Sequence, residues 1–529
     1  MAPASRLAAV GLAAFATAST ATSIPITNSL EFGPSEAAAR QNAFHIFNAI
    51  HSAMRQWGSS LNHNGMSLFL VTVPAEWLAF EIEHAELFAH PRWQGGKPPP
   101  PPPPPPHISS PQQHPLPNLN PAHHNPPTPF SSSSSSSSTN NNNNATAHGY
   151  LHTYLTTTPL HLLYLDGTSA GNTAMGTLDT QDLLLRLNRT APVWDETGRA
   201  RALCALAAAW GLDGVLRMEA GFEVIKCDFA RGMRLVGAHQ RPAERRHGHP
   251  RDVGSFEFIR AVARRYGGIG AGRVVVDWGS MVSGFWYGVQ LGEEEGMPRL
   301  VGVGERELRG IRDRVEEVVR GRKGGEKRVV DWQGVVDLVV GRYADRLRYM
   351  VEGVESLQEM QGELNGVLDT HIDYAAEDEG HQAAIGRCAR DYTMAVAPET
   401  QEDHLILTAI EVVTHSICST LFEVRKVVVE DPEAGEGSVR VAKEVLRGLM
   451  DKLRWTRWKE CAACGFNEVC FVPMWPFGDK ESHERPNCRN ATSINKGWWE
   501  QESRYWDSGP GMTPLLGKDN VPGDTMGDL

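Results

Sequence analysis

A low-complexity segment in the N-terminal half of the chain limits what can fold around it. Lys97 is followed by a run of prolines, and a His-, Pro- and Asn-rich stretch then leads into the homopolymeric runs Ser131–Ser138 and Asn140–Asn144. Such a composition buries too little apolar surface to offset the conformational entropy that is lost on ordering. We therefore expect residues 95–147 to form a disordered insert, partly polyproline II, between two pieces of one folded domain.

The first residues have the order of a secretory signal peptide. Arg6 precedes the apolar run Leu7–Ala18, and a small-residue cleavage site is present at Ala16–Ala18. The run is shorter than the ~20 apolar residues of a membrane-spanning helix, and no later stretch of uninterrupted apolar residues reaches that length. We therefore predict that residues 1–18 are removed, that the chain has no membrane span, and that the mature protein is secreted.

Export determines how the cysteines are interpreted. An even number of cysteines in an oxidising compartment predicts disulfides, but the spacing does not select one connectivity. The last four cysteines, with His483 nearby, could hold zinc in a reducing compartment, but a second close ligand pair is missing. The predicted disulfide cysteines are Cys204, Cys227, Cys388, Cys418, Cys461, Cys464, Cys470 and Cys488.

Glycosylation and charge add to the prediction of an extracellular protein. The sequons at Asn144, Asn188 and Asn490 become glycan acceptors once a chain enters the secretory pathway. The formal net charge of −12 provides no basic surface for nucleic acid. We expect no nucleic acid and no metal. The sequence leaves the partner and any cofactor unknown, with a glycan or an extracellular protein as the candidate partner.

Periodicity predicts an α/β or α+β domain over residues 24–304, with the insert inside it. Ser35 can cap a helix whose apolar residues recur at helical spacing up to Trp57. Strands that alternate with helices favour a mixed sheet covered by helices. Further helices are expected at 199–210 and 256–266, and strands at 68–73, 160–165, 222–229 and 273–276.

The pattern becomes helical from about Glu305. The longest helix, over 400–430, begins with a capping pattern in which Thr400 precedes Asp403 by three residues. We expect a mainly α-helical domain over residues 305–460 and a Cys/Trp-rich tail over 461–529 that wraps around the helices. The other amphipathic stretches are 305–320, 332–352 and 357–374. Aromatic residues of the tail that could form an exposed binding strip are Trp498, Trp499, Tyr505 and Trp506.

A set of motifs spread along the ordered chain carries a family resemblance. The motifs are Phe47–Gly58, Glu76–Ala85, Gly149–Tyr154, Gly176–Asp182, Arg217–Glu223 and Met474–Gly478. With them the chain resembles a family of predicted secreted proteins of filamentous fungi that has no assigned activity. The insert lies outside this pattern, and the chain is shorter than its relatives between Val73 and Ala75. The resemblance implies a compartment but no reaction.

Three aspartates end or follow predicted strands, where open α/β sheets place their ligands. Asp166, Asp228 and Asp277 could converge on one crevice, and Asp166 and Asp277 are the candidate catalytic residues of this set. Aspartates before glycine or between polar residues are also ordinary turn formers. A second constellation places His404, Glu411 and His415 on one stripe of the long helix, either as a metal or proton site or as a polar seam between helices.

The order of elements in the first domain loosely resembles ADP-ribosyltransferase-like domains. That resemblance implies that Glu223 is the key acid, with Tyr154 or Tyr164 stacked on the ligand, although the His or Arg of the first strand has no counterpart here. The sequence favours an extracellular enzyme with a carboxylate-based site, either glycan-acting or ADP-ribosyltransferase-like. A secreted binding or effector protein and a structural protein of the cell surface are the alternatives.

Overall fold

The computed structural model describes most of the chain outside the predicted signal peptide, the insert and the C-terminus. Those three segments therefore lie outside the described residues. So do Asn144, residues 74–78 around the predicted shortening, the motif Met474–Gly478 and the tail from Asn495 onward. The described ranges are 32–55, 65–73, 79–87, 89, 149–171, 175–193, 195–241, 255–264, 266–270, 272–294, 296–322, 330–375, 381–473 and 480–494.

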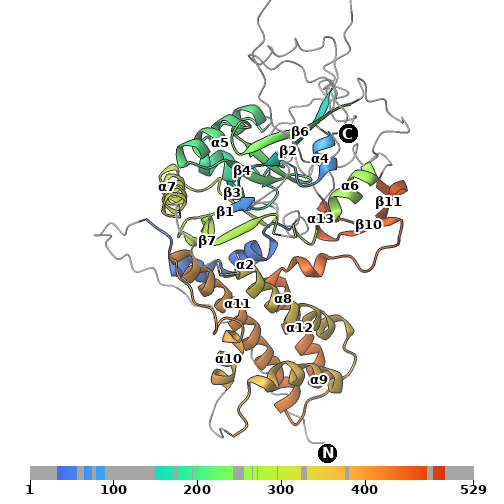
Figure 1. The fold of residues 1–529 in the computed structure, drawn as a ribbon. Helices are drawn as coiled ribbons and strands as arrows, with labels where there is room; N and C mark the ends of the chain where they lie inside the picture. Colours follow the sequence, from blue (N-terminus) through green and yellow to red (C-terminus); the bar gives the residue numbers. More distant parts are fainter. Residues whose placement is uncertain are drawn as a thin grey trace, which may run out of the picture.

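A five-stranded mixed sheet forms the centre of the N-terminal region in the described residues (Figure 1). Its strand order is β5-β4-β3-β1-β7; β3 and β4 run parallel, and the other neighbours are antiparallel. The strands are β1 Ser67–Val73, β3 Leu160–Leu165, β4 Gly214–Met218, β5 Phe222–Lys226 and β7 Val275–Ser283. Neighbouring strands pair with both edges of β1, β3 and β4, and most residues of these strands are buried. Strands β1 and β3 accordingly read as mainly apolar runs.

Helices with well-defined ends cover this sheet. Helix α5, Glu196–Trp210, begins at Asp195, whose side chain accepts a hydrogen bond from the Gly198 amide, and ends at Gly211 in the left-handed conformation. That conformation favours glycine because it has no Cβ. Helix α5 packs against β4, and α7, Glu305–Gly321, packs against β7.

The C-terminal half is mostly helical, as predicted, and shares one core with the sheet. Helix α11, Gln401–Arg425, lies at its centre and contacts the N-terminal helices α1, Glu36–Gln41, and α2, Ala43–Ser52. By length and composition alone, residues 401–430 could cross a membrane, but just over half of the apolar stretch is buried inside the protein, as in a core helix. The neighbouring helices are α8 Trp332–Arg348, α9 Leu357–Leu368, α10 His381–Arg390 and α12 Glu436–Leu453.

Three two-stranded sheets complete the described fold, one of which pairs β8, Gly292–Glu294, with β9, Met297–Arg299. Strands β2, Tyr150–Thr156, and β6, Met233–Gln240, form an antiparallel ribbon beside helix α4, Ile82–Leu87 (Figure 1). Near the C-terminus, strands β10 and β11, at 468–471 and 487–490, pair with each other. The described hairpin of the tail packs on helix α6, Ser255–Ala263, through an apolar cluster. The wrapping of the tail around the helical region stays a prediction.

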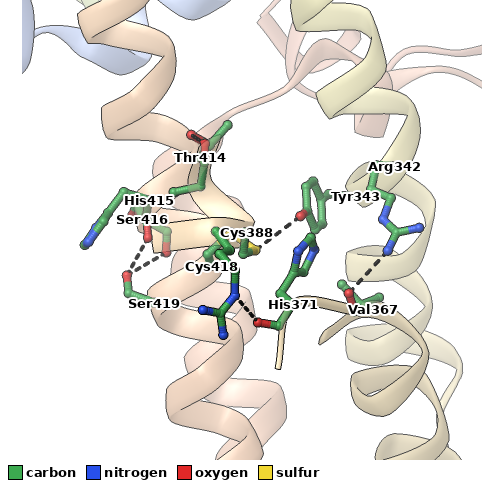
Figure 2. Close-up of a disulfide and its surroundings, with 12 residues drawn as sticks. Arg342, Tyr343, Val367, His371, Cys388, Thr414, His415, Ser416, Cys418 and Ser419 are labelled. Carbon is green, nitrogen blue, oxygen red and sulfur yellow. Dashed lines mark hydrogen bonds between the residues drawn. A yellow bond between two sulfur atoms is a disulfide. The ribbon is translucent and has the colours of Figure 1, made fainter. Parts of the chain in front are cut away.

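All eight cysteines are paired. The disulfides are Cys204–Cys227, Cys388–Cys418, Cys461–Cys470 and Cys464–Cys488. Figure 2 shows the second of these, which joins α10 to α11 beneath Tyr343, whose hydroxyl lies 3.6 Å from the Cys388 sulfur. The zinc alternative for the last four cysteines has no thiolate left to use.

The buried disulfide between α10 and α11 should contribute more stability than the shortest one. In the chain-entropy model, closing the loop of Cys388–Cys418 stabilises by about 3.6 kcal/mol and that of Cys461–Cys470 by about 2.6 kcal/mol. We expect urea unfolding of the double alanine variants to show that order. Equal losses would mean that the environment of each bond, not its loop length, determines its contribution.

Candidate active site at the β4–β5 hairpin

Strands β4 and β5 form a tight hairpin that places charged side chains together. Arg217 and Glu223 are directly opposite each other in the register, so their side chains share one face, and Arg217 Nε donates to Glu223 Oε1 at 2.6 Å. The turn between the strands contains Glu219 and Gly221. A side chain at Gly221 would not fit, because a Cβ there would lie 2.7 Å from the nearest carboxylate oxygen of Glu81.

Helix α4 lies across this hairpin and brings a buried histidine to it. Just before the helix, Glu81 accepts a hydrogen bond of 2.8 Å from the Phe222 amide and so fixes the start of α4 against β5. His84 is 2% exposed, and its Nε2 lies 3.6 Å from Glu223 Oε2 and 3.9 Å from Glu219 Oε2. The ring nitrogen and the two carboxylate oxygens all lie within 4.8 Å of one another.

A second layer of polar residues fixes Arg217. Its guanidinium donates to Gln181 Oε1 at 2.9 Å and to Glu196 Oε2 at 2.6 Å. Gln181 in turn donates to the carbonyl of Ser169, in the loop that follows β3. Because each of its three guanidinium nitrogens has an acceptor, Arg217 holds Glu223 in one orientation.

The surroundings drive the two glutamates toward opposite protonation states. Burial, together with the nearby charge of Glu223, raises the pKa of Glu219 to about 8. Burial also disfavours ionisation of Glu223, but Arg217 and His84 outweigh it and lower the pKa of Glu223 to about 2. The side chains of Glu219 and Glu223 remain 13% and 21% exposed, so solvent or a ligand can reach both. Near neutral pH the hairpin therefore presents one carboxylic acid beside one carboxylate.

The positive charge of Arg217 also bears on whether this cluster would hold a metal. A histidine and two glutamates at this spacing have the chemistry of ligands. A guanidinium 2.6 Å from Glu223 already compensates the negative charge, however, and would repel a second cation. We therefore interpret the cluster as a proton-exchanging site.

The strand-end aspartates do not come together. Asp277 on β7 is opposite Leu70, and Leu70 is opposite Leu163, three residues before Asp166. The two aspartates are separated by two strand spacings across the sheet, about 10 Å, and by three residues along the strands, also about 10 Å. Their carboxyl groups therefore lie far apart. Asp277 forms an ion pair with Arg322.

Asp166 is buried just after the end of β3, and none of the described residues gives it a charged partner. It is 1% exposed, and its Oδ1 accepts a hydrogen bond of 2.7 Å from the Gly167 amide. Burial raises the pKa of Asp166 to about 7. The third aspartate, Asp228, caps an exposed turn by accepting from the Ala230 amide, which is the turn chemistry considered as its alternative.

The two tyrosines named as ligand-stacking candidates have different environments. Tyr164 is fully buried, and its hydroxyl accepts a hydrogen bond from the Met54 amide, so it belongs to the core and does not face a ligand. Tyr154 lies on the β2–β6 ribbon and contacts Phe229.

The histidine stripe on α11 does not form a cluster in the described residues. His404 and His415 are exposed, and Figure 2 shows His415 pointing away from the neighbouring disulfide. Of the predicted glycan acceptors, Asn188 lies in a loop and Asn490 ends strand β11. Both are partly exposed, and each side chain accepts a backbone hydrogen bond. Glycosylation at both stays a prediction.

Sequence reasoning identified Glu223 but missed its neighbours. His84, Glu219 and Arg217 stand in the motifs Glu76–Ala85 and Arg217–Glu223 that carry the family resemblance. These motifs are separated by the insert, so their spacing gave no sign that they meet. Glu219 also stands next to residues typical of a turn, around Gly221, so it was not predicted to be a site residue.

Comparisons with known proteins cover this hairpin. Residues 36–247, which include all four of these residues, match the family described as YPL277C N-terminal domain. Two proteins of Saccharomyces cerevisiae are similar to the chain. "Uncharacterized protein YOR389W" is 23% identical over 399 residues, which cover 59% of this chain and 62% of the relative. "Uncharacterized protein YPL277C" is 43% identical over 77 residues, covering 13% and 16%.

The chain therefore spans less than two thirds of the length of either relative. No solved structure matches it. Together these similarities support an uncharacterised fungal family, in agreement with the resemblance in the sequence, and the printed names attach no activity to it.

Proposed function

We propose that this protein is an exported enzyme that breaks a glycosidic bond, with Glu219 as the proton donor and Glu223 as the ionised carboxylate. The observation that carries the proposal is the pair of glutamates on one hairpin whose surroundings separate their pKa values. Such a separation is how an active site obtains an acid and a base from the same residue type. The disulfides support the secreted part of the proposal, because disulfides persist in oxidising compartments.

The proposed reaction uses the two carboxyl groups in sequence. The Glu219 carboxylic acid gives its proton to the glycosidic oxygen as the bond from that oxygen to the anomeric carbon breaks. The positive charge that develops on the sugar is stabilised by the Glu223 carboxylate, which Arg217 keeps ionised. Water then adds to the anomeric carbon, and its proton returns to Glu219.

The spacing favours retention of configuration at the anomeric carbon. The facing oxygens of Glu219 and Glu223 lie within 4.8 Å of each other. Inverting enzymes separate their carboxyl groups by about 6.5–9.5 Å to admit a water molecule, whereas retaining ones hold them about 5 Å apart. Glu223 would accordingly act as the nucleophile: its carboxylate oxygen bonds to the anomeric carbon as the glycosidic bond breaks. Water, which gives its proton to Glu219, then attacks that carbon and breaks the bond to Glu223.

An ADP-ribosyltransferase-like reaction is the second candidate, and the ionised state of Glu223 favours it too. That reaction also breaks a bond at an anomeric carbon, but its pyridinium leaving group departs as a neutral base and needs no proton. Glu223 would then be essential and Glu219 dispensable. The role of Glu219 therefore separates the two candidates.

Glutamine variants test both candidates on the secreted, disulfide-bonded protein. With aryl glycosides and oligosaccharides as substrates, we expect Glu219→Gln and Glu223→Gln each to lower kcat at least 100-fold. With NAD as substrate, only Glu223→Gln should lower turnover if the second candidate is right. Glu444→Gln, an exposed change on α12, is the matched control. Turnover of none of these substrates by the parent protein would contradict catalysis and favour a binding protein.

A further inference from the structure

Aromatic side chains gather on the exposed face of the β2–β6 ribbon. We call the four residues Tyr150, His152, Tyr154 and Phe229 the aromatic ladder. Successive ring centroids lie 6.5, 6.0 and 5.2 Å apart, so each ring contacts the next. Tyr150 and Phe229 at its two ends are 51% and 46% exposed. Solvent-facing rings in unbroken contact over this length are characteristic of a binding surface.

The register explains why the rings share one face. Alternate residues of a strand point to the same side, which places the three ladder residues of β2 together. Their cross-strand partners on β6 are Gln240, Ala238 and Leu235 in turn. The face thus presents aromatic rings next to an amide, a small residue and the exposed side chain of Leu235, with an irregular register between Thr153 and Tyr154. Such irregularities re-aim side chains and are common beside functional sites.

One end of the ladder adjoins the candidate active site. Tyr150 begins β2, and the amide of Arg241, just past the end of β6, donates to the carbonyl of Gly149 at 2.9 Å. The guanidinium of Arg241 forms an ion pair of 2.8 Å with Glu86 on α4, the helix that carries His84. Figure 1 shows α4 beside the ribbon. A ligand lying along the ladder would therefore point toward the β4–β5 hairpin.

We propose that the aromatic ladder binds a chain of sugar residues and guides it toward Glu219 and Glu223. Sugar rings carry C–H groups on their faces and hydroxyls on their edges. The C–H groups match the electron-rich faces of aromatic rings, and the hydroxyls match the tyrosine hydroxyls, the His152 imidazole and the Gln240 amide. The binding claim stands on the ladder alone, whereas its direction toward the hairpin rests on the proposed function.

Other occupants fit less well. A peptide strand could add to an edge of the two-stranded ribbon, but that mode uses backbone hydrogen bonds and would not require rings on the face. The Tyr154 hydroxyl already pairs with His152 Nδ1 at 3.3 Å, but a purely apolar partner would take water from the hydroxyl of Tyr150 without replacing its hydrogen bond, at a cost in free energy. An oligosaccharide satisfies both the rings and the polar groups.

Calorimetric titration of the full secreted chain with chitohexaose, laminarihexaose and mannohexaose tests this surface. A Glu223→Gln background prevents turnover during the measurement. We expect at least one hexasaccharide to bind, and Tyr154→Ala or Phe229→Ala to raise its Kd at least ten-fold. Tyr374→Ala removes a similarly exposed ring outside the ladder and should leave the Kd unchanged.

The possible results separate this inference from the catalytic proposal. Binding that depends on the ladder, without any cleavage by the Glu223-containing parent, supports the ladder and overturns only the proposed reaction. Cleavage of a glycoside with Kd and KM untouched by Tyr154→Ala and Phe229→Ala overturns the ladder alone. If none of the three hexasaccharides binds with a Kd below the millimolar range, the ladder is not a sugar-binding surface.

Discussion

Replacing Arg217 with methionine should lower the free energy of unfolding by about 3–5 kcal/mol at pH 7, the usual cost of removing one partner from a buried ion pair. Arg217 is 7% exposed and bonds Glu223, Glu196 and Gln181 at once. Without the guanidinium, Glu223 would lose the neighbour that outweighs its burial. Urea unfolding followed by circular dichroism measures the loss.

An exposed arginine provides the matched control. Arg309 on α7 forms an ion pair of 2.7 Å with Glu305, but both side chains are more than half exposed, so Arg309→Met should cost less than about 1 kcal/mol. Combining Arg217→Met with Glu223→Gln should recover part of the loss, because the second change removes the uncompensated charge. A loss below about 1 kcal/mol for Arg217→Met alone would show that the cluster is not held together in this way.

Much of the fold follows from local residue patterns that can be recognised in the sequence. Ser35 accepts a hydrogen bond from the Ala38 amide, Gly211 ends α5, and Thr400 and Asp403 form a capping box, each as expected from its residue type. Buried strands such as β3 appear as apolar runs. Element type could therefore be predicted wherever one residue pattern dominates.

Prediction failed where a long-range contact overrides the local pattern. The strand expected at 273–276 extends to Ser283, because the polar residues after Val276 form an irregular pairing with β1 and do not turn. There the Ser280 hydroxyl accepts a hydrogen bond from the Leu70 amide at 2.7 Å. A polar segment that reads as a turn is thus stabilised as a strand by a partner distant in sequence.

The candidate site could be predicted only in part, for the same reason. Glu223 was accessible to sequence reasoning because it lies on a strand with an alternating pattern. Its pairing with Arg217 depends on the hairpin register, and its approach to His84 depends on a helix on the other side of the insert. Asp166 and Asp277 illustrate the opposite error. Strand β7 continues to Ser283, so Asp277 lies near the start of its strand, whereas Asp166 follows the end of β3, and β1 lies between the two strands.

Asp166 gives the clearest pH signature. Its pKa is raised to about 7 in the folded state, compared with 3.8 for an unburied aspartate, so between these values the folded protein holds a proton that the unfolded chain has lost. The contribution of Asp166 to stability is therefore fully present below about pH 4 and falls as pH rises to about 7, by about 4 kcal/mol in total.

Replacing Asp166 with asparagine should abolish that dependence. Asparagine keeps the oxygen that accepts from the Gly167 amide and has no charge to bury at any pH. We therefore expect the free energy of unfolding of the variant minus that of the parent to increase by about 4 kcal/mol between pH 4 and pH 8, measured by urea unfolding across that range. At pH 4 the variant should be no more stable than the parent, because both carry a neutral group and the amide lacks a second partner.

Asp277→Asn is the matched control: it leaves Arg322 without its ion-pair partner and should destabilise near neutral pH. A difference curve for Asp166→Asn that stays flat with pH would mean that this carboxyl group is ionised in the folded protein and solvated or paired through a rearrangement of the loop after β3.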